Sequence, residues 1–421
     1  MIQPVKPPVL ISHPAKQGTI YFRPWAAQRE GFPVRFATGL YYQPQRWPYS
    51  WLRRIPKIER SLKRRSIEGL DPQNVISFGG PWLELLCRPL RPFGFLGGAL
   101  WYDAVHDRLV AQAIRRGDFG SEPRIFHGFQ NSCLRSMIEA KKRGWPTLLE
   151  ITLPPCMTKI VHEERLRLGL KSASGEIPKR QIQEIETADY TVHQSHFSMR
   201  CAESLGAPRN RMVHLPMGGD MRRFSPRATR TEGDPLVILV LGQLQIRKGI
   251  HHLLEVWSEW MPPQAKLRLV GACSDPDMRP ILRRYEGCFE WRGFAPAEEL
   301  PEIYREADVF VVPSLAEGGV NVIYEAMASG LPCVVSDRAG SAVVDGVNGF
   351  VFPAGDRAAL RGALESLYKD RELRRTMGRA ALERARMFRW EDFSRRLGAM
   401  YLKLFAADKA SLPDVLDMTN A

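Results

Sequence analysis

The stretch VFVVPSLAEGGVNVIYEAMASGLPCVVS at residues 309–336 decides how the second half of this chain folds. The apolar run at 309–314 predicts a buried strand, residues 320–330 predict a helix, and 332–336 predict a second apolar strand. Two adjacent glycines separate the first strand from the helix. Strands joined through a helix pair in parallel, so the stretch predicts a doubly wound α/β sheet.

The same alternation of strand and helix patterns extends outward in both directions. Strand-like runs recur at 236–242 and 266–271 in the second half, and at 74–78 and 147–152 in the first. Residues 222–236 are rich in charged and turn-forming residues and lack periodicity, which is typical of a linker. We therefore expect two Rossmann-like domains that divide near residue 225.

Composition excludes several classes of protein. The chain has 421 residues, of which 44% are apolar and 25% charged, so neither disorder nor a coiled coil is expected. No apolar run approaches the roughly 20 residues of a membrane span, and MIQPVKPPVLISH at the start resembles no secretory leader, so we expect a cytoplasmic protein. The seven cysteines are scattered and form no CxxC pair, so we expect small apolar fillers rather than disulfides or a zinc site.

The charge is distributed unevenly. Up to residue 225 there are 34 basic against 19 acidic residues, and after it 26 against 27. A phospholipid surface, an acidic glycan or a nucleic acid could each face the basic half. Residues 51–70 hold seven basic and two acidic residues with apolar residues at near-helical spacing, so they could lie on an anionic bilayer. They could equally form a solvated helix or a wall of an acceptor site, and Pro56 interrupts a continuous helix.

Polar and glycine residues follow the strand at 309–314, at the sheet edge where open α/β proteins bind ligands. The backbone N–H groups of Gly319, Val320 and Asn321, at the start of a helix, could bind a diphosphate. Glu317 and Glu325 could accept hydrogen bonds from two hydroxyl-rich groups, a pattern that fits a nucleotide sugar. Alternatively, Glu317 caps the helix and Glu325 is a solvated residue.

Arg247 and Lys248 follow another strand end, where they could bind phosphate or simply be surface charges. The segments GQLQIRKGIHHLLEVW at 242–257, the quoted 309–336 stretch and DGVNGFVFPAGD at 345–356 resemble the retaining GT-B glycosyltransferases of family 4, the group 1 glycosyltransferases. The resemblance is strong over 181–405 and only topological over 1–150.

This resemblance implies the GT-B fold, in which two doubly wound Rossmann-like domains face each other across a cleft. Residues 1–225 would bind the acceptor and 226–395 the nucleotide sugar, and 396–421 would form a helix returning to the first domain and a frayed tail. Glu317 and His127 would be catalytic, with His162 as a rival to His127. The residues implied to bind the donor are Gly18, Arg247, Lys248, Gly293, Phe294, Gly318, Gly319, Val320, Asn321 and Glu325.

The implied activity is retaining transfer of a hexose from a UDP- or GDP-linked sugar to a glycan or lipid-linked acceptor in cell-surface polysaccharide biosynthesis. No convincing DxD pair follows a strand, so no obligatory metal or other cofactor is expected. Gln243, the Gly318–Gly319 order and the run after Gly340 depart from the family pattern and leave the donor sugar open. A nucleotide-sugar epimerase or hydrolase, or a noncatalytic basic binding module, are the alternatives. No RNP, KH or zinc motif supports nucleic-acid binding, so no nucleic-acid partner is expected, and peripheral contact with the inner face of a membrane through residues 51–70 stays one of the open alternatives.

Overall fold

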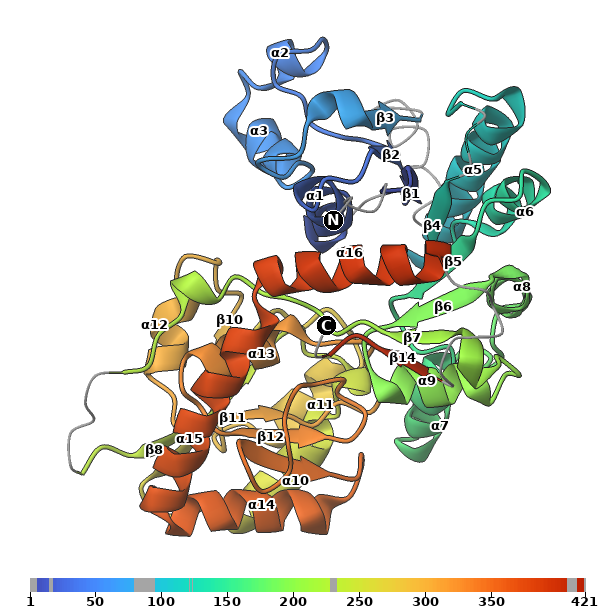
Figure 1. Cartoon of the computed structure of the whole chain (residues 1–421). Coiled ribbons are helices and arrows are strands. Elements are labelled where there is room, and N and C mark those ends of the chain that lie inside the picture. Colours follow the sequence, from blue (N-terminus) through green and yellow to red (C-terminus); the bar gives the residue numbers. More distant parts are fainter. Residues whose placement is uncertain are drawn as a thin grey trace.

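The computed structural model describes residues 6–14, 18–78, 95–120, 122, 124–227, 233–406 and 415–419. Two parallel sheets, one of eight strands and one of six, form separate domains with helices on both faces (Figure 1). Because both faces are covered, seven of the fourteen described strands are buried along their whole length instead of alternating between core and solvent. The predicted α/β fold of two doubly wound domains is confirmed.

The first domain is built on the eight-stranded sheet, in the order β14-β7-β6-β5-β4-β1-β2-β3. Its strands are β1 (Val9–Ser12), β2 (Val34–Thr38), β3 (Val75–Ser77), β4 (Ile125–Phe129), β5 (Thr147–Ile151), β6 (Tyr190–His193), β7 (Met212–His214) and β14 (Val415–Asp417). Its helices are η1 (Gly18–Tyr21), α1 (Phe22–Arg29), α2 (Tyr49–Leu52), α3 (Pro56–Lys63), η2 (Pro72–Asn74), α5 (Phe95–Arg116), α6 (Leu134–Lys142), α7 (Met157–Arg167), α8 (Lys179–Thr187), α9 (His196–Glu203), η4 (Arg209–Arg211) and η5 (Met221–Arg223). The strand order reverses between β1 and β4, which marks the position where open sheets bind ligands.

The second domain is built on the six-stranded sheet, in the order β10-β9-β8-β11-β12-β13. Its strands are β8 (Leu236–Leu241), β9 (Ala265–Val270), β10 (Glu290–Gly293), β11 (Val309–Val312), β12 (Cys333–Ser336) and β13 (Gly349–Phe352). Its helices are η6 (Ile246–Lys248), α10 (Ile250–Trp260), α11 (Met278–Arg284), α12 (Leu300–Arg305), α13 (Asn321–Ala328), α14 (Arg357–Lys369), α15 (Arg371–Ala385) and η7 (Arg386–Phe388). Here the order reverses between β8 and β11.

The chain returns to the first domain through α16 (Trp390–Ala406), which packs along α1 (Figure 1). The rings of Trp390 and Phe22 stack with their centroids 3.7 Å apart. The expected fraying of the tail is wrong for residues 415–419. Residues 415–417 form the edge strand β14, which pairs in parallel with β7, and Leu416 is buried there. Pairing with an existing sheet edge orders a segment too short to be recognised from its own sequence.

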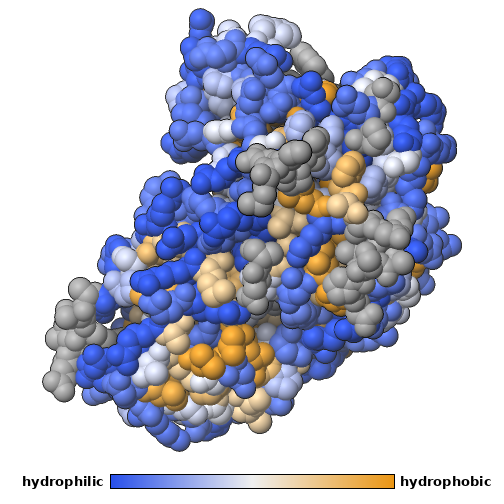
Figure 2. Space-filling view, viewed as in Figure 1, coloured by the Kyte–Doolittle hydropathy of each residue, from blue (hydrophilic) through white to orange (hydrophobic). Residues whose placement is uncertain are grey.

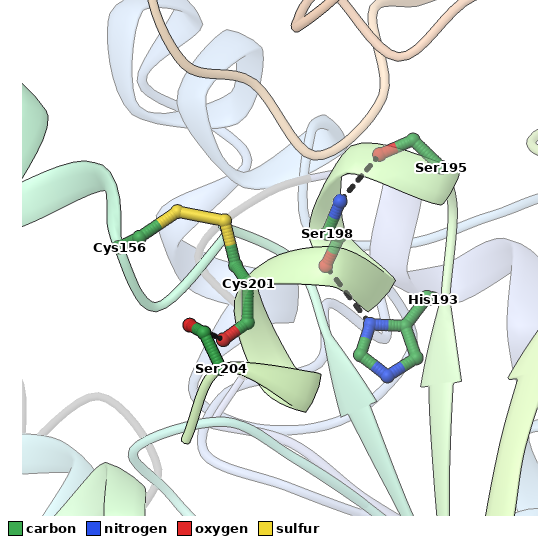
Figure 3. Close-up of a disulfide and its surroundings, with 6 residues drawn as sticks. All are labelled: Cys156, His193, Ser195, Ser198, Cys201 and Ser204. Atoms are coloured by element: carbon green, nitrogen blue, oxygen red, sulfur yellow. Dashed lines mark hydrogen bonds between the residues drawn. A yellow bond between two sulfur atoms is a disulfide. The ribbon is translucent and has the colours of Figure 1, made fainter. Parts of the chain in front are cut away.

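Two cysteines do not act as separate apolar fillers. Cys156, just before α7, and Cys201, on α9, form a disulfide with their Cα atoms 5.6 Å apart (Figure 3). The helices α7 and α9 follow the neighbouring parallel strands β5 and β6, which brings together two residues 45 positions apart. Cysteines 133, 273, 288 and 333 are free thiols, and Cys87 lies outside the described residues.

Residues 51–70 form two short helices rather than one. Pro56 occupies the first turn of α3, after an extended Ile55, so α2 and α3 are separate. Figure 2 shows a largely hydrophilic surface over the upper part of the first domain and an indentation between the two domains. Within the described part of the chain, no helix has the length and apolar character needed to cross a bilayer.

Candidate functional site

Two cations and a carboxylate meet at the carboxyl edge of the second sheet, where its strand order reverses. Arg247 and Lys248 lie in η6, which follows β8, and Glu317 lies in the loop that follows β11. Glu317 pairs with the Arg247 guanidinium, and its Oε1 lies 2.7 Å from Lys248 Nζ. The Glu317 side chain is only 6% exposed. The two strand-end segments that the sequence singled out therefore form one cluster.

The turn that holds the two cations depends on Gly249. Its φ is 65°, and a Cβ there would lie 1.9 Å from the Pro313 carbonyl oxygen, so only glycine fits. The Leu315 N–H donates to the Arg247 carbonyl at 2.9 Å, which joins the turn directly to the loop after β11. Burial lowers the pKa of Lys248, and pairing with Glu317 partly opposes that effect. The structure thus fixes a net positive charge at this edge.

Helix α13 begins beside these cations. Val320 is its N-cap in an extended conformation and provides no capping side chain, so the helix start presents backbone N–H groups and the positive end of its dipole. Ser314 Oγ and Asn321 Oδ1 are buried near the helix start and have no hydrogen-bond partner among the described residues. These two oxygens could accept hydrogen bonds from a ligand, whereas the N–H groups of the helix start, together with Arg247 and Lys248, have the chemistry of an anion site.

Gly318 and Gly319 bring this loop against the first domain. A Cβ on Gly318 would lie 2.0 Å from the Thr152 carbonyl oxygen, just beyond β5. A Cβ on Gly319 would lie 2.7 Å from Oε1 of Gln194, just beyond β6. The carboxyl edges of both sheets therefore meet at this loop, and substitution of either glycine would push the domains apart by different amounts.

Glu325 and Gly293 lie further along the same edge. Glu325 Oε2 accepts a hydrogen bond from the Tyr304 hydroxyl at 2.9 Å. Burial raises the pKa of the Glu325 carboxyl, and the Tyr304 hydrogen bond partly opposes this. Gly293 ends β10 with a φ of 73°, and the following Phe294 is 72% exposed. The structure leaves the Phe294 ring free to contact a ligand.

His127 is placed differently from the expectation. It lies within β4 with 0% exposure, its Nδ1 is 2.7 Å from the Tyr401 hydroxyl on α16, and its Nε2 is 3.3 Å from Glu150 Oε2. The His127 side chain is thus buried between Glu150 and Tyr401 in this structure, and its contact with a donor sugar stays a prediction. Its rival His162 lies on α7 and hydrogen-bonds the Ala173 carbonyl at 2.7 Å.

The sequence analysis missed a buried ionic network in the first domain. Gly18 opens η1, and the following helix α1 carries Arg23, which pairs with Glu150 on β5. Both side chains are 1% exposed, and Gln194 Nε2 donates to Glu150 Oε1 at 3.0 Å. Burial alone would raise the pKa of Glu150, but Arg23 and His127 hold it well below its usual range. The sequence feature that could have indicated this network is the glutamate in the otherwise apolar run TLLEI, because a buried carboxylate needs a partner.

Comparison with solved structures defines the class of fold. Sucrose-phosphate synthase from Thermosynechococcus elongatus superposes with a TM-score of 0.64 at 20% identity, covering 96% of this chain and 100% of that one. HepE from Anabaena, solved with UDP-glucose, gives a TM-score of 0.61 at 16% identity, covering 94% and 100%. The chain therefore has the GT-B fold.

Comparison of sequences shows which proteins the second domain resembles. Residues 235–370 match the family described as "Glycosyl transferases group 1". D-inositol 3-phosphate glycosyltransferase from Corynebacterium aurimucosum is 32% identical over 241 residues, which are 52% of this chain and 57% of that protein. The Nocardia farcinica protein of the same name is 34% identical over 240 residues, 52% of each chain. The chain thus spans about half the length of the curated relatives it matches, and its similarity to the group 1 glycosyltransferase family model covers residues 235–370 of the second domain.

Proposed function

We propose that this protein is a retaining glycosyltransferase that moves a hexose from a nucleoside-diphosphate sugar to a hydroxyl of a glycan or lipid-linked acceptor. The observation that carries the proposal is the cluster of Arg247, Lys248 and Glu317 beside the start of α13. The family match supports glycosyl transfer, and HepE, which shares the fold, was solved with UDP-glucose. A matched relative from Salmonella typhimurium, WcaL, is named for colanic acid biosynthesis, which supports a role in cell-surface polysaccharides.

The cations supply the electrostatic part of the proposed reaction. As the bond between sugar and phosphate breaks, negative charge grows on the departing nucleoside diphosphate. Arg247 and Lys248 are already fixed beside the α13 N-terminus, so they stabilise that charge with little reorganisation. Glu317, paired with both cations, is oriented to accept hydrogen bonds from sugar hydroxyls. The acceptor hydroxyl attacks from the face of the leaving phosphate, through an oxocarbenium-like state, and its proton passes to the departing phosphate oxygen.

The remaining donor contacts follow the edge of the second sheet. Glu325 accepts hydrogen bonds from the ribose, and the turn at Gly293 and Phe294 contacts the base. The N–H groups of the loop and helix start at residues 318–321 bind the diphosphate, and the turn at Gly18 closes over it from the first domain. The buried carboxylate of Glu325 and the exposed ring of Phe294 support these roles.

The donor site is tested first by binding. Purified protein is screened for thermal stabilisation by UDP-, GDP- and ADP-sugars, since a ligand that binds only the folded state raises apparent stability. We expect a shift with one nucleotide, lost in Glu325→Gln and kept in Glu302→Gln, a surface control paired with Arg305. Absence of a shift with every nucleotide would contradict the proposal and favour a noncatalytic module.

Turnover then separates transfer from the alternative reactions. With the stabilising donor, Glu317→Gln should reduce kcat by about 100-fold, as expected for loss of one preorganised polar group. Product that forms at the same rate with and without acceptor would indicate an epimerase or hydrolase instead. Analysis of the anomeric configuration of the product checks retention, and an inverted product would refute that part of the proposal.

We also propose that residues 51–70 hold the acceptor-binding domain on an anionic membrane. Trp51 and Ile55 are 58% and 41% exposed, and Arg53 and Arg54 beside them are exposed as well. At roughly 1 kcal/mol for each basic residue near the surface, replacing both arginines by alanine weakens binding about 30-fold.

Co-sedimentation with vesicles that contain anionic lipid measures this effect. Replacing the exposed pair Arg283 and Arg284 on α11 by alanine is the matched control, and it should leave binding unchanged. Binding that is absent in the wild type, or insensitive to added salt, would refute the membrane contact.

A further inference from the structure

A second cluster of chemically reactive side chains joins the two domains away from Glu317. Glu164 lies on α7 of the first domain, and His251 and His252 lie in the first turn of α10 of the second. His251 Nε2 is 2.6 Å from Glu164 Oε1, and His252 Nε2 is 3.2 Å from the same oxygen. Each of these side chains is at most 12% exposed. The three candidate ligand atoms lie within 4.8 Å of one another.

The imidazoles of this cluster are not satisfied by the protein. Among the described residues, Nδ1 of His252 has no hydrogen-bond partner, and its Nε2 makes only the 3.2 Å contact with Glu164 Oε1. Nδ1 of His251 also lacks one. A buried polar group without a partner destabilises a fold, and such groups in native structures usually point to an ion, a water or a functional role. His252 is 6% exposed and directs a nitrogen at the shared carboxylate oxygen.

We propose that Glu164, His251 and His252 bind a divalent transition-metal ion of the zinc class. Two imidazoles and one carboxylate form a ligand set that zinc accepts, with a fourth position left for water. With metal–ligand distances of about 2.0–2.2 Å, tetrahedral ligand atoms lie roughly 3.3 Å apart, which is near the 2.6 and 3.2 Å between the two Nε2 atoms and Glu164 Oε1.

The surroundings of the carboxylate also suit this role. Arg167 donates to both oxygens of Glu164: its Nε lies 3.0 Å from Oε1 and 3.1 Å from Oε2, and its Nη2 lies 2.7 Å from Oε1, the oxygen that faces the imidazoles. Ligating carboxylates in metal sites are commonly held in this way by further hydrogen bonds. Arg167 is about half exposed, so it can turn toward solvent without disrupting the core.

The position of the cluster gives the ion a structural task. Helix α10 begins directly after the turn of Arg247 and Lys248, and α7 lies against that turn. An ion held by ligands from both domains would therefore secure the contact between the first domain and the turn. It would touch neither donor nor acceptor. The proposal stands whether or not the chain transfers a sugar.

Metal binding to the purified full-length chain tests the proposal. After treatment with a chelator, Zn²⁺ is titrated by calorimetry and Co²⁺ by its visible absorption, which reports nitrogen and oxygen ligands directly. We expect one ion per chain. At metal concentrations that saturate the wild type, Glu164→Gln and His252→Ala should bind no ion. Glu164→Gln preserves the shape of the side chain. Circular dichroism without metal establishes that each variant is folded.

Two controls identify the site. His162→Ala removes another histidine of α7, and His214→Ala removes the central member of the other candidate cluster, formed with His196 and Asp417. Both variants should bind the ion as the wild type does. The proposal is overturned if the wild type binds no ion, if folded Glu164→Gln retains full affinity, or if binding disappears in His214→Ala.

Discussion

Replacing Gly318 by alanine tests how closely the two domains must approach. The φ of Gly318 is not in the left-handed region, so alanine is compatible with its backbone conformation. The new Cβ would nevertheless lie 2.0 Å from the Thr152 carbonyl oxygen of the other domain. Ordinary Cβ contacts begin at 3.4 Å, so the loop and the end of β5 must separate by more than an ångström. The strain therefore falls on the interdomain contact and not on either core.

The size of the effect follows from that separation. A displacement of about 1 Å in a catalytic arrangement can reduce the rate by roughly 100-fold, which corresponds to about 2.7 kcal/mol of transition-state stabilisation. The loop at residues 313–319 contains both Glu317 and Gly318. If the loop is displaced, the Glu317 carboxylate moves away from the groups of the first domain that face it. We expect kcat/KM for the nucleotide sugar to fall by about that factor while thermal stability stays nearly unchanged.

Gly319→Ala is the matched control. Its Cβ would meet Gln194 Oε1 at 2.7 Å, so the strain falls on one side chain, which is hydrogen-bonded to Glu150, and not on the backbone. We expect less than a fivefold loss, or about 1 kcal/mol. Initial rates with the donor found by screening measure both variants, and small-angle scattering reports the spacing of the domains. If Gly318→Ala has wild-type kinetics, or if both variants lose activity equally, the closed interdomain contact is not required for turnover.

Three further predictions follow from buried groups. Cys156→Ser opens the 45-residue loop closed with Cys201 and should lower the free energy of unfolding by about 4 kcal/mol in urea titrations, after which a reductant should have no further effect. Glu150→Gln leaves Arg23 buried without its counter-charge and should lower stability by about 3–5 kcal/mol at pH 7. Burial opposes ionisation of Glu150, but its pKa is net lowered. The stabilisation that ionised Glu150 provides is therefore complete above about pH 4.5 and is lost as the pH falls further. The free energy of unfolding of Glu150→Gln should accordingly depend less on pH in acid than that of the wild type. Equal pH dependence in the two proteins would contradict the argument. Burial raises the pKa of Glu325, so nucleotide affinity of the wild type should fall in binding titrations as the pH drops through that raised value, and an affinity that stays constant would contradict the argument.

Much of the second domain could be predicted because each strand and helix shows in the pattern of its own residues. The quoted stretch predicted strands at 309–314 and 332–336 around a helix, and β11, α13 and β12 lie within those ranges. An apolar run of strand length, followed by glycines and an amphipathic helix, leaves few other ways to bury its residues. The break at Pro56 was also readable, since proline ends one helix and begins another.

The errors concern contacts between distant segments. The β14 strand at 415–417 is ordered by β7, about 200 residues earlier, and three residues cannot show that partner in their own pattern. Cys156 and Cys201 have no motif spacing, and only the adjacency of β5 and β6 brings them together. His127 lies inside the sheet because Tyr401, on the returning helix, covers it.

In the candidate site, too, contacts within one sheet could be predicted and contacts between distant segments could not. Arg247, Lys248 and Glu317 each follow a strand of one sheet, so the strand-end rule was sufficient to place them together. The groups that fix this cluster against the first domain are Gly318 beside Thr152 and the chain of bonds from Gln194 to Glu150. Each of those pairs joins different strands or different domains, so no spacing encodes it. The residues proposed to bind the donor could therefore be predicted from the second domain alone. The contacts between the two domains, including the proposed metal site between α7 and α10, exist only where the domains are assembled.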